Sequence, residues 1–114
     1  MDESVARDKT ARAYSRIANL REELRKEKDS AIHERYVREY HGALDHLRDA
    51  GHDIEEFRIP DEEMEHRLLS SSPSYGHRYS EERYVEQAFI LSKMGAVLTY
   101  FDVMGSGQTI GFRA

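Results

Sequence analysis

The stretch from Ser4 to Lys28, SVARDKTARAYSRIANLREELRKEK, has the pattern of a long helix with one apolar seam. The seam residues recur at alternating intervals of four and three, the spacing of a single helical face. They are Ala6, Thr10, Ala13, Ile17, Leu20 and Leu24. Basic residues border both sides of the seam, so two copies zipped together would place like charges opposite each other. We therefore expect this helix to pack on the acidic part of its own chain, or on an acidic partner or phosphate-bearing ligand.

The next stretch predicts a second helix on residues 30–50. Asp29 and Ser30 form a capping signal that interrupts the heptad phase, and Gly51 stands where a glycine commonly ends a helix. The apolar face of this helix comprises Ile32, Tyr36, Tyr40, Ala43, Leu44 and Leu47. If the break at Asp29 is a turn, residues 4–50 form an antiparallel hairpin. If it is only a change of phase, they form one long bent helix.

The second half of the chain adds less regular segments. Ile54, Phe57 and Ile59 are expected to be buried anchors, and Asp61 is expected to cap a short third helix after Pro60. The serine-rich segment 70–79 is interpreted as a loop. Residues 80–104 predict a last helix that is apolar around nearly its whole circumference, which indicates a central position or cover by a second subunit.

These elements together predict an all-α fold. We expect a small helical bundle of three to four helices, with an N-terminal helical hairpin and a central buried C-terminal helix. The predicted domain organisation is a single helical domain at residues 1–104 and a C-terminal tail at residues 105–114, with Gly105 ending the last helix.

Composition limits the classes of function. The 114 residues include no cysteine and carry a net charge of −5, distributed as +2 over residues 1–28, −7 over residues 29–69 and zero over residues 70–114. An acidic chain of this kind has no overall attraction for DNA or for anionic lipid, so we expect neither DNA nor a membrane as partner. The absence of cysteine and of an apolar N-terminal run favours a cytoplasmic protein.

No catalytic or metal-binding set is recognisable. Glu63 and His66 have the Glu-x-x-His spacing of helical di-metal sites, but such sites need a second copy of the motif, and only Asp49 and His52 approach it. No serine lies in a nucleophile motif. We therefore expect no enzyme activity, no metal and no cofactor.

Two binding roles remain. The first is a non-catalytic helical interaction or oligomerisation module that acts as a docking or regulatory protein, with itself (a homo-oligomer) or an acidic protein as partner; half-buried tyrosines favour this role. Its expected interface residues are Tyr84, Phe89, Val97, Tyr100 and Phe101. The alternative is binding or sequestration of an anionic, nucleotide-like small molecule through cationic and aromatic groups. Its candidate ligand-binding residues are Arg12, Arg16, His33, Arg58, His77, Arg78 and Tyr79.

Overall fold

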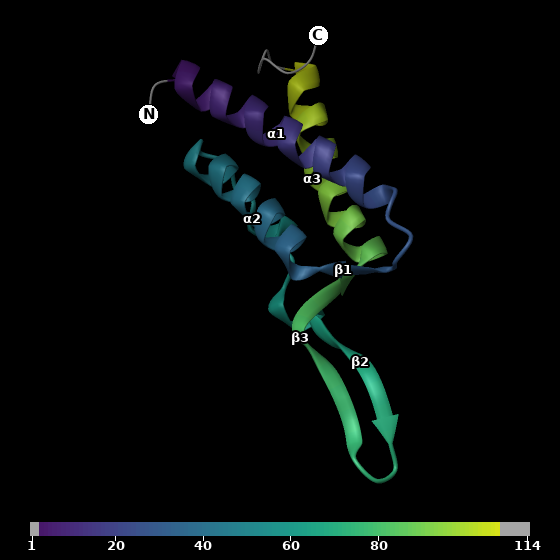
Figure 1. Cartoon of the computed structure of the whole chain (residues 1–114). Coiled ribbons are helices and arrows are strands. Elements are labelled where there is room, and N and C mark those ends of the chain that lie inside the picture. Colours follow the sequence, from purple (N-terminus) through teal and green to yellow (C-terminus); the bar gives the residue numbers. More distant parts are fainter. Residues whose placement is uncertain (1–2, 108–114) are drawn as a thin grey trace.

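The protein has a helical body from which a long β-hairpin projects (Figure 1). The computed structural model describes the backbone of residues 3–107 and the side chains of residues 3–104. The body contains the helices α1 (Glu3–Arg25), α2 (Glu34–Asp49) and α3 (Gln87–Gly107), and the hairpin consists of β2 (Glu65–Ser72) and β3 (Gly76–Glu86). A short strand, β1 (Ala31–His33), and the 3-10 turns η1 (Glu55–Phe57) and η2 (Asp61–Glu63) connect them. The hairpin makes the molecule elongated, at 62 × 26 × 17 Å.

The prediction of an all-α bundle is wrong, because three strands form an antiparallel sheet in the order β1-β3-β2. Segment 70–79 is the end of a hairpin rather than a loop, and residues 80–86 belong to β3 rather than to the last helix. The expected third helix is reduced to the single turn η2. The central strand β3 pairs with β1 through Ile32 and Val85, which are far apart in the sequence. A pairing between such distant residues leaves no pattern in the local sequence.

The helical hairpin is confirmed in its main feature: α1 and α2 lie side by side and run in opposite directions (Figure 1). Strand β1 lies in the connection between them, so the phase break at Asp29 is a real change of element. The seam of α1 is buried as predicted, except that Ala6 is only partly covered. Its buried residues are Thr10, Ala13, Ile17, Leu20 and Leu24.

Both ends of α2 follow from local chemistry. At its start, the Nδ1 atom of His33 accepts the backbone N–H of Arg35 at 3.0 Å, which satisfies one of the unpaired donors of the first turn. At its end, Gly51 has a φ of +100° and donates to the carbonyl of Arg48, while His52 donates to that of Leu47. This pair of hydrogen bonds is the Schellman motif, and it confirms the expected role of Gly51.

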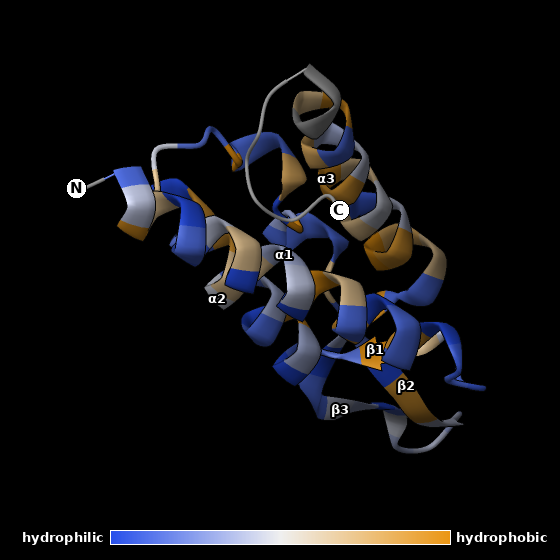
Figure 2. Ribbon diagram, turned by 90° about the horizontal axis from the view of Figure 1, so that it is seen from above, coloured by the Kyte–Doolittle hydropathy of each residue, from blue (hydrophilic) through white to orange (hydrophobic). Residues whose placement is uncertain are grey.

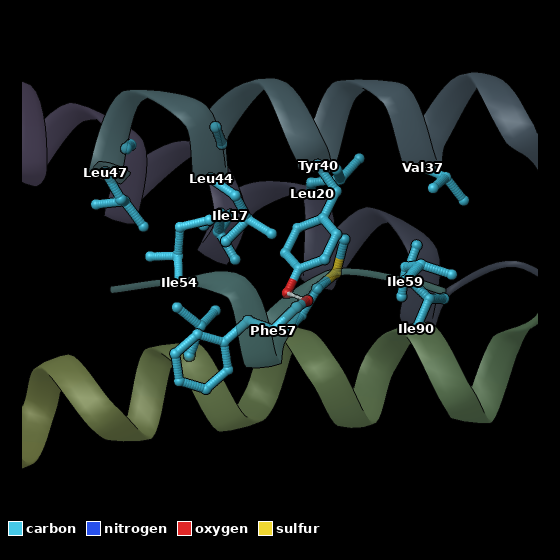
Figure 3. Close-up of a cluster of buried hydrophobic side chains, with 14 of the residues drawn as sticks. Ile17, Leu20, Val37, Tyr40, Leu44, Leu47, Ile54, Phe57, Ile59 and Ile90 are labelled. Atoms are coloured by element: carbon cyan, nitrogen blue, oxygen red, sulfur yellow. Dashed lines mark hydrogen bonds between the residues drawn. The ribbon is translucent and has the colours of Figure 1, made fainter. Parts of the chain in front are cut away.

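One apolar core lies between the three helices and the chain that leaves α2 (Figure 3). The anchors expected after α2, Ile54, Phe57 and Ile59, are all buried in it. Tyr40 is fully buried at its centre, and its hydroxyl donates a hydrogen bond of 2.7 Å to the carbonyl of Phe57. This bond satisfies two buried polar groups and ties η1 to α2, because neither group has access to water there.

Helix α3 is not the central helix that the sequence predicted. It packs with one side on α1 and η1, while the opposite side, with Ser92, Ala96, Thr99 and Val103, is exposed. Figure 2 shows apolar residues on several sides of this helix, whereas α1 and α2 have mostly polar outer surfaces. The helix continues to Gly107, so it passes Gly105, and residues 108–114 of the predicted tail lie outside the described residues. Helix α3 therefore stands at one side of the body, and its exposed side carries a mixture of small polar and apolar residues.

The first residue of α3 also completes the end of α1. The side-chain amide of Gln87 donates to the carbonyls of Leu24 and Glu27, at 2.8 and 3.0 Å. Carbonyls in the last turn of a helix have no partner within the helix, so Gln87 supplies one from a distant part of the chain. The β3–α3 junction is in this way fixed to the body.

Candidate functional site

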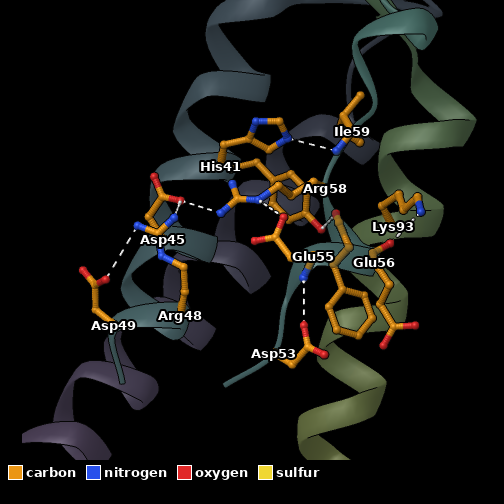
Figure 4. Close-up of polar contacts among 12 residues, drawn as sticks. His41, Asp45, Arg48, Asp49, Asp53, Glu55, Glu56, Arg58, Ile59 and Lys93 are labelled. Atoms are coloured by element: carbon orange, nitrogen blue, oxygen red, sulfur yellow. Dashed lines mark hydrogen bonds and ion pairs between the residues drawn. The ribbon is translucent and has the colours of Figure 1, made fainter. Parts of the chain in front are cut away.

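A group of polar side chains surrounds Arg58 and connects elements of the fold (Figure 4). The Arg58 guanidinium donates to Asp45 at 2.7 Å and to Glu55 at 3.1 Å. The hydrogen bond from Arg58 is the main reason that the pKa of Asp45 lies below its ordinary value. Because both carboxylates already hold the guanidinium, Arg58 connects α2 to η1 and offers little to an anionic ligand.

Two half-buried histidines, His41 and His52, also form hydrogen bonds within the fold. The Nε2 atom of His41 accepts the backbone N–H of Ile59 at 2.9 Å, so that atom carries no proton. The Nε2 atom of His52 lies 3.1 Å from the hydroxyl oxygen of Thr10, whose hydrogen is donated to the carbonyl of Ala6. His52 is therefore the donor in that bond. Burial lowers the pKa of both rings, which keeps them neutral near pH 7.

The residues considered for metal binding do not converge. Glu63 lies in η2 and His66 in β2, so the pair does not share the helix face that their spacing requires. The Nδ1 atom of His66 donates to the carbonyl of Ser80 at 2.7 Å, a bond that organises the hairpin. Over residues 3–107 no group of three or more possible ligands is placed to hold a metal ion.

The predicted ligand-binding residues fall in four separate places. Arg12 and Arg16 lie together on α1, Arg58 joins α2 to η1, and His33 caps α2. The remaining three lie near the end of the hairpin, on β3. They are His77, Arg78 and Tyr79. The structure thus brings together Arg12 and Arg16 on one helix and the three hairpin residues on one strand, but it does not gather the whole set.

The predicted interface residues are also divided. Val97 and Phe101 are fully buried in the core of their own chain, and Phe89 packs against that core. Tyr84 lies at the base of the hairpin, where its ring contacts His33 edge-on and Arg67 lies over its face. Tyr100 is the one member of the set with a large exposed surface, at 36%.

The base of the hairpin is firmly attached to the body. Arg67 of β2 forms an ion pair of 2.9 Å with Asp29, and Arg83 of β3 forms one of 2.8 Å with Asp61. Between them, Ser80 occupies a bulge and is buried; its hydroxyl accepts the N–H of Arg67 and donates to the carbonyl of Glu82. These contacts fix the direction in which the hairpin leaves the body.

Beyond its base, the hairpin exposes large apolar side chains. We call residues 68–79 the arm; it comprises the ends of β2 and β3 and the turn at Pro73–Tyr75 (Figure 1). Its exposed fractions are 54% for Leu68, 62% for Leu69, 57% for Tyr79 and 90% for Tyr75. Leu68 and Tyr79 are paired across the two strands and share a face. Solvated two-stranded ribbons of this kind are marginally stable by themselves.

The arm is the functional candidate that sequence reasoning missed. Serines and a proline suggested a loop, yet Gly76 within a short turn segment between Leu68 and Tyr79 is a hairpin signal. Gly76 has a φ of +77°, and Ser72 accepts the N–H groups of Ser74 and Tyr75 in the turn. Because β2 is the outer strand of the sheet, no other strand within residues 3–107 pairs with the outer backbone edge of its eight residues.

A basic hollow marks the opposite end of the molecule. It has a volume of about 390 Å³ and lies between α1 and α2. The charged residues that line it are Asp8, Lys9, Arg12 and Arg16 of α1, and His46 of α2 lines it as well. Arg12 forms an ion pair of 3.1 Å with Asp8 on its own helix. Over residues 3–107 no ion pair joins α1 to α2.

None of the helices within residues 3–107 has the length and apolar content needed to cross a bilayer. Comparisons with protein families, with curated proteins and with solved structures found no match to this chain.

Proposed function

We propose that the protein is a non-catalytic interaction module that forms a homodimer through its arm. The observation that carries the proposal is the exposed apolar surface of the arm, with Leu68, Leu69 and Tyr79 each more than half exposed. Exposed apolar clusters on a protein surface mark contact sites, and an unpaired strand edge is a template for a further strand. The free edge of β2 and the leucines on it are the parts that a partner would cover.

A second copy of the chain is the partner that suits this strand. The sequence of β2 is EHRLLSSS, with charges at its start, leucines in its middle and serines at its end. If two copies pair antiparallel with the two copies of Leu69 directly opposite each other, the charged half of each strand faces the serine half of the other. No like charges then meet, and the leucines of both copies come together, as a two-fold symmetric contact requires.

Other features of the molecule support a non-catalytic role. The polar groups of Arg58, His41 and His52 are engaged in bonds that connect elements of the fold. The alternative role, binding of a nucleotide-like anion, has less support because its predicted residues lie in four places. We also propose that the protein is located in the cytoplasm, because the chain contains no cysteine that could form a disulfide in an oxidising compartment.

The absence of cysteine also allows a sharp test. In a Leu69→Cys variant the introduced thiol is the only one in the chain, and the proposed pairing brings the two copies of position 69 close to the symmetry axis. We expect mild oxidation to give a disulfide-linked dimer, because adjacent strands place such residues within bonding distance. The matched control is Val103→Cys on α3, which is 68% exposed and lies away from the arm.

Light scattering on unmodified protein gives the independent measurement. We expect a dimer at micromolar concentration that becomes a monomer in the variant Leu68→Ser/Leu69→Ser and persists in Val103→Ser. A monomer at all concentrations, or equal cross-linking at positions 69 and 103, would contradict the proposal.

A further inference from the structure

The surface between α1 and α2 contains a second, independent feature that the proposed dimer does not use. The basic hollow adjoins another, of about 520 Å³, that continues along α1 to Asn19 and Glu23 and includes Glu39 of α2. Arg12 and Arg16 line both hollows, so the two hollows are neighbours along α1. We call the two together the α1–α2 groove.

The two ends of the groove carry charges of opposite sign. Lys9, Arg12 and Arg16 lie at one end, and Glu23 and Glu39 lie at the other. Over the part of the chain that the structure describes, Lys9 and Arg16 have no ion pair, and the Arg12 side chain is 81% exposed despite its bond to Asp8. This contrasts with Arg58, Arg67 and Arg83, each of which joins two elements through a carboxylate. Although Asp8 also lines the basic end, this end therefore carries an excess of positive charge on a protein whose net charge is −5.

The spacing of these cations indicates the shape of a suitable ligand. Lys9, Arg12 and Arg16 are three and four residues apart, so they lie along one face of α1 and span about 10 Å at 1.5 Å per residue. A second helix lying along the groove would present carboxylates at the same three- and four-residue intervals. A small anion would remain largely in solvent in such an open groove, since ligand pockets usually enclose most of their ligand.

We propose that the α1–α2 groove binds an acidic amphipathic helix of a partner protein. The carboxylates of that helix lie over Lys9, Arg12 and Arg16, and its apolar residues lie against Val5, which is 50% exposed and also lines the basic end. The docked helix makes a third member of a bundle with α1 and α2. Its acidic end faces Arg12, because Glu23 and Glu39 repel it from the other end of the groove.

The test uses the whole protein and a synthetic helical peptide as probe. The peptide carries glutamates three and four residues apart on one face with leucines beside them, and the comparison peptide carries glutamines in their place. We expect fluorescence anisotropy to show that the glutamate peptide binds at least about tenfold more tightly, because several exposed charge pairs together account for such a factor. Raising the salt from about 50 to 300 mM should weaken this binding, since the Debye length shortens.

Charge reversal locates the site. We expect Arg12→Glu/Arg16→Glu to lose about tenfold or more in affinity, whereas Arg25→Glu/Lys26→Glu, which changes the net charge equally at the exposed end of α1, keeps it. Circular dichroism and the oligomeric state should be the same for both variants, because these side chains are exposed and lie away from the arm.

Three results would overturn the proposal. They are equal affinity for the two peptides, undiminished binding in Arg12→Glu/Arg16→Glu, and displacement of the peptide by inorganic phosphate or a nucleoside triphosphate at similar affinity. The last would assign the groove to a small anion instead of a helix.

Discussion

The helical body and the arm both contain leucines, but they differ in how far these side chains are buried. In the body, Leu44 and Leu47 are fully buried, whereas in the arm Leu68 and Leu69 are more than half exposed. Burial of a leucine contributes about 2 kcal/mol to folding, and an exposed leucine contributes almost none of this. The body thus buries its leucines within its own fold, while the arm leaves its leucines exposed to solvent.

The largest expected effect tests this contrast with the same substitution in both regions. Leu44→Ala removes a side chain at 0% exposure and should lower the free energy of unfolding by about 3 kcal/mol. Leu69→Ala should change it by less than about 0.5 kcal/mol when the protein is dilute enough to be monomeric. Urea denaturation followed by circular dichroism measures both. Equal losses at the two positions would show that the arm packs on its own body.

Glycines with positive φ give a second comparison. Gly51 of the body, at +100°, ends α2, and Gly76 of the arm, at +77°, follows the hairpin turn. We expect Gly51→Ala to cost about 1 kcal/mol of global stability, because an alanine is strained in this conformation. Gly76→Ala should leave urea unfolding of the body unchanged and accelerate amide exchange in the arm alone. A global loss from Gly76→Ala would mean that body and arm unfold as one unit.

The smallest expected effect is a dependence on pH that arises in the body. Burial lowers the pKa of His41 and His52 in the folded state, so the unfolded chain binds protons first as the pH falls. Stability should therefore decline as the pH falls below the unfolded value of about 6.5, before carboxylates titrate. Urea denaturation at a series of pH values from about 6.5 down to the range in which carboxylates titrate measures how the free energy of unfolding changes with pH.

Two glutamine variants assign that slope. His41→Gln keeps an acceptor for the N–H of Ile59 without a titrating ring and should flatten the pH dependence. His52→Gln keeps a donor near the hydroxyl of Thr10 and should lessen the pH dependence as well. If neither variant lessened it, the slope would come from groups elsewhere in the protein.

The candidate sites were predictable to different degrees. The cations of the α1–α2 groove follow from the sequence, because Lys9, Arg12 and Arg16 border the apolar seam of a helix whose periodicity is clear. The arm does not follow in this way. Its strands alternate poorly, and bulges near Leu69 and Ser80 shift their register, so neither the period of two nor the composition identifies them.

Local sequence alone determined the elements that depend on near neighbours. The buried seam of α1, the end of α2 at Gly51 and the burial of Ile54, Phe57 and Ile59 all rest on side-chain periodicity or on the conformational freedom of glycine. Tertiary structure decided the rest. Whether residues 80–86 form a strand or a helix depends on the pairing of Val85 with Ile32, and whether α3 is central or lateral depends on which neighbours cover it. Contacts between distant residues supply the free energy for these choices, and such contacts exist only once the chain has folded.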